Sequence, residues 1–487
     1  MSEFKKLLFT IKGQKLVAKV GLKDLGFKPT HVWNPSPSYE HRVTPYELPM
    51  DIIIGLKGNR ITCAKYSPPP FALILENKDQ KALISVACKP GYHFWNQVDF
   101  FNKLTGSVVE IDLEGHSDPK VVNKKVELHI TLGNPGESRH ELLKRGLMQD
   151  YPEANKPREI PDWWLKPIYC GWGDQVTISQ YLEGVGEEAR ALAYCTQGLY
   201  ERWIRRLDEA GVPFGTTIID AGWSPTGVWE VDTIKWPDLR GFIDREHARG
   251  RKVLLWIGTW LYDGLAKEYC STMDGQQLTT DPTNPRYMKK VTEWVKHLIG
   301  PDGINADGFK IDQLAWSPSH RRFWTGSRFG LMRELEPSKK RVIKFHGKGW
   351  GTELLYRLQK NIYESAKSVK PDCLITSSTV HPYFHDTFDM VRIHDMGYVA
   401  EDIFEAMKAR VDLGKAALPH APTDTDDWVH TNYDTWLKYT AGSHVLGVPC
   451  IFYAEHFMLN WKAEPATKLI PMSDLKKIAK EWKKHAL

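Results

Sequence analysis

The sequence predicts an α/β protein in which an all-β region precedes a larger region of alternating strands and helices. Residues 1–135 contain short strand-like runs separated by turn residues, whereas residues 166–456 alternate short apolar runs with longer amphipathic ones. The chain has 487 residues, and a single hydrophobic core stops growing at roughly 250–300 residues, so we expect more than one domain. These observations favour an N-terminal β-sandwich followed by a (β/α)8 TIM barrel.

The first region has the strand lengths and turn spacing of a β-sandwich. The strands predicted in it are 6–11, 15–20, 71–75, 82–87, 107–113 and 125–132. Residues 136–165 are charged and punctuated by Pro, which predicts a linker. No cluster of acidic or nucleophilic residues stands out in residues 1–135, so we assign this domain a structural or substrate-shaping role.

The second region, residues 166–456, is predicted to be the catalytic barrel. Its strands are predicted at 167–171, 216–221, 252–257, 308–312, 373–380, 390–395, 415–422 and 448–455. Its helices are predicted at 187–210, 238–249, 285–299, 353–370, 400–413 and 435–446. The segment between the fifth and sixth strands is too short for a full helix, and the fourth unit carries a long basic insertion, residues 317–350. Residues 457–487 are predicted to form a C-terminal helical tail.

Composition excludes several classes of function. The chain has 65 Lys and Arg against 60 Asp and Glu, and this net charge of +5 is too small to indicate nucleic-acid binding. Seven Cys residues without a CxxC pair indicate neither a disulfide framework nor a zinc site. The first residues lack the apolar core of a signal peptide and no 18-residue apolar run occurs, so we expect a cytoplasmic protein without a membrane role. The 19 Trp residues favour a carbohydrate ligand, because indole faces pack against sugar C–H groups.

Acidic and aromatic side chains recur where the predicted barrel strands end, which is where such barrels carry their active sites. Asp220, Asp312 and Asp395 end the second, fourth and sixth strands. A single Asp at such a position commonly caps the next helix, but three of them together with neighbouring Trp residues favour a shared pocket. The Trp residues at or near the ends of the first three strands are Trp172, Trp223 and Trp256.

Two carboxylates that face one pocket suit glycoside cleavage, in which one attacks the anomeric carbon and the other serves as acid and then base. The nucleophile must stay ionised, and Lys310 lies two residues before Asp312, on the same face of an ideal strand. Arg392 lies three residues before Asp395, so we expect it to face the other side unless the strand bends.

Four segments resemble the retaining α-glycosidases of the clan that holds glycoside hydrolase families 27, 31 and 36. They are Ile218-Ile-Asp-Ala-Gly-Trp, Lys235-Trp-Pro-Asp, Lys252-Val-Leu-Leu-Trp-Ile and Gly308-Phe-Lys-Ile-Asp. The resemblance covers roughly residues 165–400, and family 36 α-galactosidases look closest. It implies that Asp312 is the nucleophile, that Asp395 is the acid/base, that Asp220 and Lys310 bind sugar hydroxyls and that Trp256 lines the pocket, with no metal or cofactor.

The sugar is less well specified than the clan. Family 36 enzymes usually have two adjacent Asp residues on the second strand, where this chain has Asp220-Ala221. The expected activity is therefore a retaining α-galactosidase-like hydrolase, with an α-glucosidase, α-xylosidase or transglycosidase as alternatives. A non-catalytic carbohydrate-binding protein is the alternative from another class.

Each role has a competitor. Asp386 and Asp389 are alternatives to Asp395 as the acid/base, although Asp389 begins its strand rather than ending it. His381, His385, Asp386, His394 and Asp395 could together bind a metal, but the chain lacks the His-x-His with which barrel metallohydrolases open.

Two charged segments have simpler explanations. The run Asp424-Thr-Asp-Asp427 resembles half a calcium loop, and we expect a solvated helix N-terminus there, with Asp427 as a rim contact. The basic insertion predicts a solvated face or a subunit contact in a homo-oligomer, or else attraction of an anionic sugar.

Overall fold

The computed structural model describes most of the chain. The described residues are 4–21, 26–33, 55–57, 60–63, 72–96, 98–103, 106–184, 188–312, 318, 323–325, 333–335, 342–393, 402–458 and 467–484. Much of the basic insertion, and residues 394–401 with Asp395, lie outside them.

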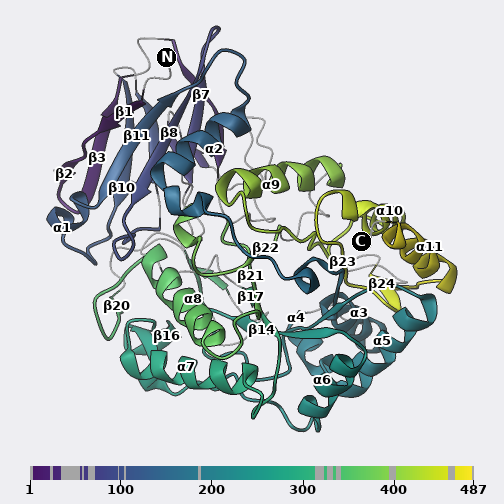
Figure 1. Cartoon of the computed structure of the whole chain (residues 1–487). Helices are drawn as coiled ribbons and strands as arrows, with labels where there is room; N and C mark the ends of the chain where they lie inside the picture. Colours follow the sequence, from purple (N-terminus) through teal and green to yellow (C-terminus); the bar gives the residue numbers. More distant parts are fainter. Residues whose placement is uncertain are drawn as a thin grey trace.

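Two antiparallel sheets form the N-terminal part of the molecule (Figure 1). The first has the order β1 (Phe4–Leu7), β11 (Val126–Leu132), β8 (Lys81–Cys88), β7 (Ala72–Glu76) and β4 (Lys28–Trp33). The second has the order β2 (Thr10–Lys12), β3 (Lys15–Val20), β10 (Gly106–Asp112), β9 (Val98–Lys103), β6 (Arg60–Cys63) and β5 (Gly55–Lys57). All six predicted strand regions are strands, and the long run 6–11 divides between β1 and β2.

The segment predicted as a linker contains regular structure. Helix α1 (Pro119–Asn123) precedes β11, and α2 (Arg139–Asp150) follows it. Ser138 and Glu141 form a capping box at the start of α2, which satisfies backbone donors that would otherwise be unpaired. Gly146 of α2 packs closely on Leu83 of β8, so that a larger residue at position 146 would require the Leu83 side chain to move.

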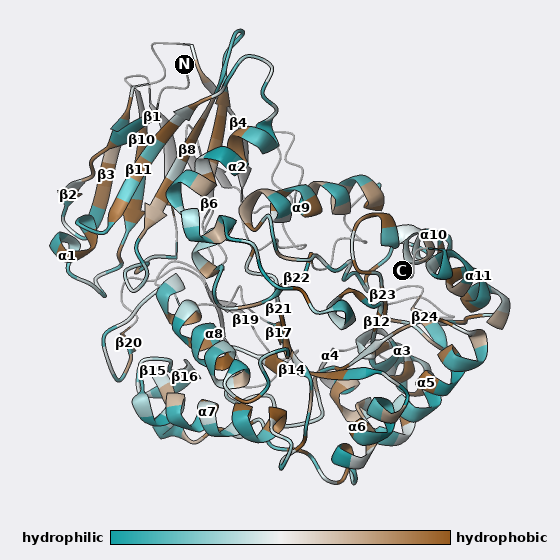
Figure 2. Cartoon of the chain, in the orientation of Figure 1, coloured by the Kyte–Doolittle hydropathy of each residue, from teal (hydrophilic) through white to brown (hydrophobic). Residues whose placement is uncertain are grey.

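A curled parallel sheet forms the second part of the molecule, and helices cover its outer side (Figure 1). The strand order is β22 (Met390–Val391), β21 (Leu374–Ser377), β17 (Gly308–Asp312), β14 (Lys252–Gly258), β13 (Thr216–Ile219), β12 (Ile168–Cys170) and β23 (Cys450–Ile451). Central strands of this sheet are largely apolar, as the brown segments of β14 and β17 in Figure 2 show. Such runs are typical of parallel strands that are buried on both faces.

The connection between the two end strands of the sheet differs from the prediction. Residues 415–422 were expected to be a strand, but α9 (Ile403–Ala417) occupies the first part of this range. Two isolated parallel bridges, Val391 with Thr423 and Asp424 with Val448, lie between β22 and the residues that precede β23.

The helices of this part follow the strands as predicted, with some differences at their bounds. They are α3 (Trp172–Glu183), α4 (Glu188–Ala191), α5 (Gln197–Ala210), α6 (Leu239–Ala248), α7 (Pro285–Ile299), α8 (Thr352–Lys367), α9, α10 (Tyr433–Gly442) and α11 (Met472–Lys483). The predicted helix 187–210 is wrong as a single element, because α4 and α5 are separate, and α3 was not predicted. Helix α11 agrees with the predicted C-terminal helix.

Smaller sheets complete the described structure. One consists of β16 (Gln276–Thr280), β15 (Cys270–Met273) and β20 (Ile343–Lys344). The pairs β18 (Phe323–Thr325) with β19 (Arg333–Leu335), and β24 (His456–Met458) with β25 (Thr467–Leu469), are hairpin-like. Among the described residues, no helix has both the length and the apolar character that crossing a membrane requires.

A polar contact joins the N-terminal sheets to the start of α8. The backbone N–H of Thr352 donates to the carbonyl of Trp95 at 3.1 Å, and Gly91 N–H donates to the Tyr383 hydroxyl at 3.0 Å. Tyr383 in turn donates to Glu353 at 2.6 Å. The two parts of the chain therefore share hydrogen bonds close to the carboxyl side of the parallel sheet.

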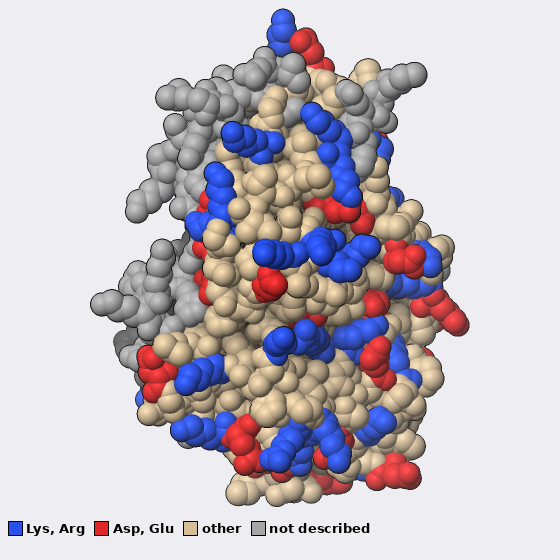
Figure 3. Space-filling model, turned by 90° about the vertical axis from the view of Figure 1, so that its left-hand side faces the viewer, with Lys and Arg blue, Asp and Glu red and all other residues tan. Residues whose placement is uncertain are grey.

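Both signs of charge occur on the face shown in Figure 3, where Asp and Glu side chains lie among the Lys and Arg side chains. This distribution agrees with the small net charge of the whole chain.

Candidate active site

The register of the parallel sheet places three of the predicted site residues on one face. Trp256 of β14 is the partner of Lys310 of β17, and Gly258 is the partner of Asp312. Side chains two residues apart on a strand share a face, so Trp256, Lys310 and Asp312 all point to the interior of the curled sheet. Asp312 is the last residue of β17, at the carboxyl end.

The carboxylate of Asp312 receives a hydrogen bond on each oxygen. The indole Nε1 of Trp256 donates to Oδ2 at 3.0 Å, and Nη1 of Arg392 lies 3.4 Å from Oδ1. The Asp312 side chain keeps 16% of its surface exposed, whereas Arg392 keeps 2%. Donors of this kind stabilise the ionised carboxylate, and the remaining exposure leaves room for a reacting atom to approach.

Lys310 shares a strand face with Asp312, as predicted from strand alternation, and forms a buried ion pair with Asp220. Its Nζ lies 2.8 Å from Oδ2 of Asp220, and the Cys170 thiol donates to the same oxygen at 3.1 Å. Burial alone would lower the pKa of the Lys310 amine, but Asp220 raises it well above its ordinary value. Lys310 is therefore an ammonium group, and the cation beside Asp312 is Arg392.

Arg392 points into the site, against the expectation from an ideal strand. Strand β22 ends at Val391, so the alternation of a strand no longer governs the direction of Arg392. Its Nε donates to Oδ2 of Asp426 at 2.6 Å, and its Nη1 also donates to the carbonyl of Ile311 at 3.1 Å. The guanidinium is thus bound by Asp426 and by the carbonyl of Ile311 as well as by Asp312.

The acidic run after α9 is buried, so the expectation of a solvated helix N-terminus is wrong. Asp424, Asp426 and Asp427 are 2%, 2% and 4% exposed, and the next helix, α10, begins only at Tyr433. Burial and the nearby charge of Asp426 raise the pKa of Asp424 to about 8, whereas Arg392 and Lys310 act to lower it. The surroundings of Asp424 thus favour its protonated form.

Two of the predicted Trp residues pack behind the site. Trp223 is fully buried, and its Nε1 donates to the carbonyl of Trp256 at 2.8 Å. Trp172 begins α3 and meets Trp428 edge to face, with ring centroids 5.9 Å apart. The first contact fixes Trp223 against the backbone of Trp256, the residue that donates to Asp312.

The two alternatives to Asp395 as the acid/base each form an ion pair with a Lys side chain of α8. Asp386 forms an ion pair at 2.8 Å with Lys360 of α8. Asp389 lies just before β22, at the amino end of this strand, and accepts hydrogen bonds from the backbone of Ile375 and from Lys367, each at 2.9 Å. Asp395 itself lies outside the described residues, so its distance to Asp312 stays a prediction.

Of the His residues that were considered as metal ligands, the structure describes His381 but not His394. His381 is buried, and its Nδ1 accepts a hydrogen bond from the backbone N–H of Tyr383 at 2.9 Å. Burial lowers the pKa of His381 to about 3, so the ring is neutral. Within the described ranges, no group of three or more His, Cys, Asp or Glu side chains is arranged to hold a metal ion. His394 lies outside these ranges.

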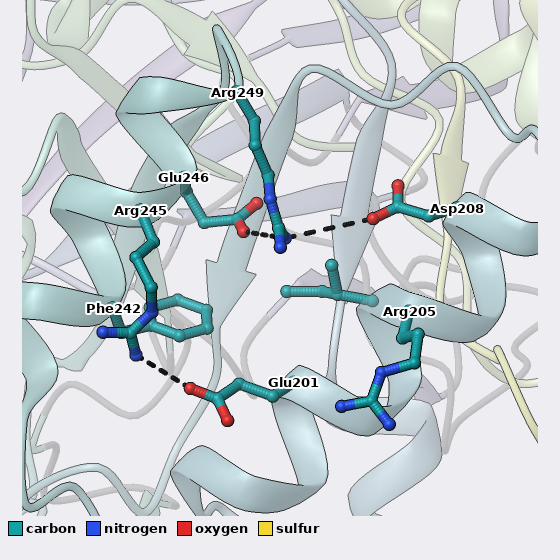
Figure 4. Close-up of a pocket in the computed structure, with 8 residues that line it drawn as sticks. Glu201, Arg205, Asp208, Phe242, Arg245, Glu246 and Arg249 are labelled. Carbon is teal, nitrogen blue, oxygen red and sulfur yellow. Dashed lines mark hydrogen bonds and ion pairs between the residues drawn. The ribbon is translucent and has the colours of Figure 1, made fainter.

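Two hollows of the surface lie away from the Asp312 cluster. One, of about 250 Å³, lies between α5 and α6 and is lined mainly by alternating acidic and Arg side chains (Figure 4). In it, Arg245 pairs with Glu201 at 2.8 Å and Arg249 pairs with Glu246 at 2.8 Å. A larger hollow of about 1310 Å³ includes Pro167, Gly215 and Pro449, which precede β12, β13 and β23, so it lies at the amino ends of the strands.

Sequence reasoning missed Asp424, Asp426 and Cys170 as members of the site. The dense Asp424-Thr-Asp-Asp427 run was the available signal, because three carboxylates within four residues are unusual for a simple helix cap. Nothing in the local sequence of Cys170 marks it, since its contact with Asp220 depends on the pairing of β12 with β13.

Comparisons with known proteins show the fold. No family model matches the sequence, and no curated protein matches it. Among solved structures, the cycloalternan-degrading enzyme from Trueperella pyogenes has a TM-score of 0.58 at 14% identity, over 99% of this chain and 69% of that one. The same enzyme with a covalent intermediate has a TM-score of 0.57 at 15% identity, over 99% and 66%. A GH31 α-xylosidase from a soil metagenome, complexed with xylose, has a TM-score of 0.50 at 14% identity, over 90% and 57%.

This chain thus shares the fold of these enzymes and spans 57% to 69% of their length. The family number that appears among the three structures is 31, and none of them is described as an α-galactosidase. The expectation that family 36 is the closest relative is therefore not supported.

Proposed function

We propose that this protein is a retaining glycoside hydrolase that cleaves α-linked glycosides, with Asp312 as the nucleophile. The observation that carries the proposal is the environment of Asp312: it ends a central strand of the curled sheet, and Trp256 and Arg392 each bind one of its oxygens. The buried Lys310–Asp220 pair beside it offers polar groups that suit sugar hydroxyls. The shared fold with enzymes that act on sugars supports the same conclusion.

In the proposed reaction, Asp312 attacks the anomeric carbon and the bond to the leaving oxygen breaks. Asp395 gives its proton to that oxygen, which leaves a β-glycosyl ester on Asp312. Asp395 then removes a proton from water, and water attacks the same carbon while the ester bond to Asp312 breaks and its carboxylate is released. The product regains the α configuration. A retaining mechanism predicts that the carboxyl groups of Asp312 and Asp395 lie about 5–5.5 Å apart.

We propose a neutral α-glucoside or α-xyloside as the substrate, ahead of an α-galactoside. Structural neighbours are described as degrading cycloalternan, binding isomaltose and binding xylose. The described groups of the site do not favour an anionic sugar, because the carboxylates of Asp220, Asp312 and Asp426 already outnumber the cations Lys310 and Arg392.

We also propose that the curled sheet closes as an eight-stranded barrel, with residues 1–135 as a β-sandwich domain, 136–165 as a connecting segment and 166–456 as the barrel. The bridges at Thr423 and Asp424 support this, because they occupy the place of a seventh strand between β22 and β23.

The test is a panel of aryl α-glycosides, with glucoside, xyloside, galactoside and an anionic glycoside, assayed with the wild type and Asp312→Ala. We expect turnover of the glucoside or xyloside by the wild type and a loss of at least about 10⁴-fold in the variant. Azide should restore cleavage by Asp312→Ala and yield the β-glycosyl azide, because it replaces the missing nucleophile. Asp244→Ala, which removes an exposed carboxylate of α6, is the matched control. Ligand binding without turnover by the wild type would instead support a carbohydrate-binding protein.

A further inference from the structure

The Arg392 guanidinium is held between two carboxylates and a carbonyl. Its Nε donates to Asp426 at 2.6 Å, while its Nη1 reaches the carbonyl of Ile311 at 3.1 Å and the carboxylate of Asp312 at 3.4 Å. A guanidinium is planar, so fixing Nε and Nη1 fixes the plane and the direction of every N–H. The direction in which Arg392 meets Asp312 therefore depends on Asp426.

Asp426 is itself held in place by the backbone around it. Its N–H donates to the side chain of Asp424 at 3.2 Å, and Asp424 N–H donates to the carbonyl of Val391 at 2.9 Å. The N–H of Thr425 donates to the carbonyl of Val448 at 3.0 Å. The segment that carries Asp426 is thus hydrogen-bonded on both sides, to the end of β22 and to the residues before β23.

Other titratable groups surround this pair, and the charge of Asp426 acts on the pKa of several of them. Among the described residues they come from six elements or connections: Cys170 of β12, Asp220 after β13, Lys310 of β17, Asp424 before β23, Cys450 of β23 and Tyr439 of α10. A substitution of Asp426 therefore removes the charge and the hydrogen bond that it supplies to Arg392, together with its effect on these neighbours.

We propose that Asp426 is a positioning residue for the glycosidase reaction, which orients Arg392 against Asp312 and shares its positive charge. This inference rests on the proposed function, because it assigns a role within the same site. Asp426 acts through Arg392, and its carboxylate limits how strongly the guanidinium stabilises the ionised form of Asp312. An intact Asp426 thereby keeps Asp312 correctly oriented and basic enough to attack carbon.

Two substitutions separate the hydrogen bond from the charge. Asp426→Asn keeps an oxygen that can accept from Nε but removes the negative charge, so the acidic limb of the kcat/KM profile should move to lower pH. Asp426→Ala removes both and frees the guanidinium, and we expect kcat/KM to fall about 10–100-fold with little change in KM. Asp389→Asn is the control, because it breaks another largely buried ion pair, with Lys367, just before β22. The acidic limb of the kcat/KM pH profile of Asp389→Asn should match that of the wild type.

A second measurement does not depend on turnover. The carboxyl carbon resonance of Asp312, assigned by comparison with Asp312→Asn, reports its titration directly, and the titration should shift to lower pH in Asp426→Asn. A wild type without glycosidase activity would refute the proposed function while this resonance still tests the Asp426–Arg392–Asp312 coupling. Unchanged titration of Asp312 in Asp426→Asn, or full kcat/KM in a folded Asp426→Ala, would overturn the inference.

Discussion

Trp256 and Arg392 divide the two oxygens of Asp312 between them, and this arrangement suits a nucleophile. Each donor is a group that cannot readily lose its proton, so neither competes with Asp312 for one. Both donors are almost fully buried, at 3% and 2% exposure, which makes their hydrogen bonds to a charged oxygen stronger than they would be in water.

Replacing Trp256 by Phe should keep an aromatic surface and remove the donor to Asp312. A hydrogen bond to a charged group contributes about 1.5–3 kcal/mol, so kcat/KM for the preferred aryl glycoside should fall about 10–100-fold. Trp203→Phe, in the buried face of α5, is the control for loss of an indole elsewhere. Equal kinetics for Trp256→Phe and the wild type would show that this bond has no role.

Replacing Lys310 by Met should leave the carboxylate of Asp220 buried without its cation. Breaking one side of a buried ion pair typically costs about 3–5 kcal/mol, and we expect a loss of this size in urea unfolding. The double variant Lys310→Met with Asp220→Asn removes the unpaired charge and should recover part of the stability. A double variant less stable than Lys310→Met would contradict the account of this pair.

At the level of elements, the sequence predicts best where local signals and burial agree. Helix α7 has its predicted bounds because Pro285 suits a first helical turn and the side chain of Asn284 caps it. Strand β17 also has its predicted bounds, since an apolar run ends there in charged residues. Residues 415–422 were misassigned because their short apolar run continues the buried face of α9, which a periodicity of so few residues cannot distinguish from a strand.

The site likewise contains residues that local sequence patterns could place and residues that they could not. Asp220, Lys310, Asp312 and Trp256 were predictable together, because adjacent parallel strands bring their carboxyl ends to one edge. Arg392 and Asp426 were not predictable in their roles, because they lie after β22 and within an irregular connection. Tertiary hydrogen bonds, rather than strand alternation, set their directions.

Asp174 links α3 to the segment after β23, and its titration should affect stability. It accepts hydrogen bonds from the Tyr169 hydroxyl at 2.9 Å and from the backbone N–H of Ala454 and Glu455 at 2.8 and 3.2 Å. Burial nevertheless raises the pKa of Asp174 to about 8. In the unfolded chain this carboxyl loses its proton near pH 4, so between pH 4 and 8 the folded state holds a proton that the unfolded state has released.

The free energy of unfolding should therefore fall as pH rises through this window, by about 1.4 kcal/mol per pH unit for this one proton. Asp174→Asn cannot titrate, so its stability should fall less steeply between pH 5 and 7, even where its absolute stability is lower. Urea unfolding at pH 5, 6 and 7 measures both slopes, with Asp244→Asn as an exposed control. Parallel slopes for the wild type and Asp174→Asn would refute the assignment.

At the level of the whole molecule, the N-terminal sheets and the parallel sheet are joined by close backbone contact. Gly351 has a φ of +61°, and a Cβ added there would lie 2.5 Å from the carbonyl oxygen of Trp95. Neither the left-handed conformation nor this approach suits a larger residue. The contact lies at the start of α8.

Gly351→Ala should destabilise the protein more than Gly250→Ala does. Gly250 also has a positive φ, +74°, but nothing lies within 4 Å of an added Cβ, so it is the control for a positive φ without overlap. The additional overlap with Trp95 should cost about 1–3 kcal/mol more, and thermal unfolding followed by circular dichroism compares the two variants. Equal losses of Tm in the two variants would show that the overlap with Trp95 does not destabilise the protein.

The central claim is that Asp312 forms a covalent bond with the sugar. The direct measurement is mass spectrometry of peptides after incubation with 5-fluoro-α-glucosyl or 5-fluoro-α-xylosyl fluoride, combined with NMR of the anomeric configuration of the first product. We expect one glycosyl group on the peptide that carries Asp312, none on that peptide in Asp312→Ala, and an α-configured product. Labelling of a different carboxylate, or a β-configured first product, would contradict the account.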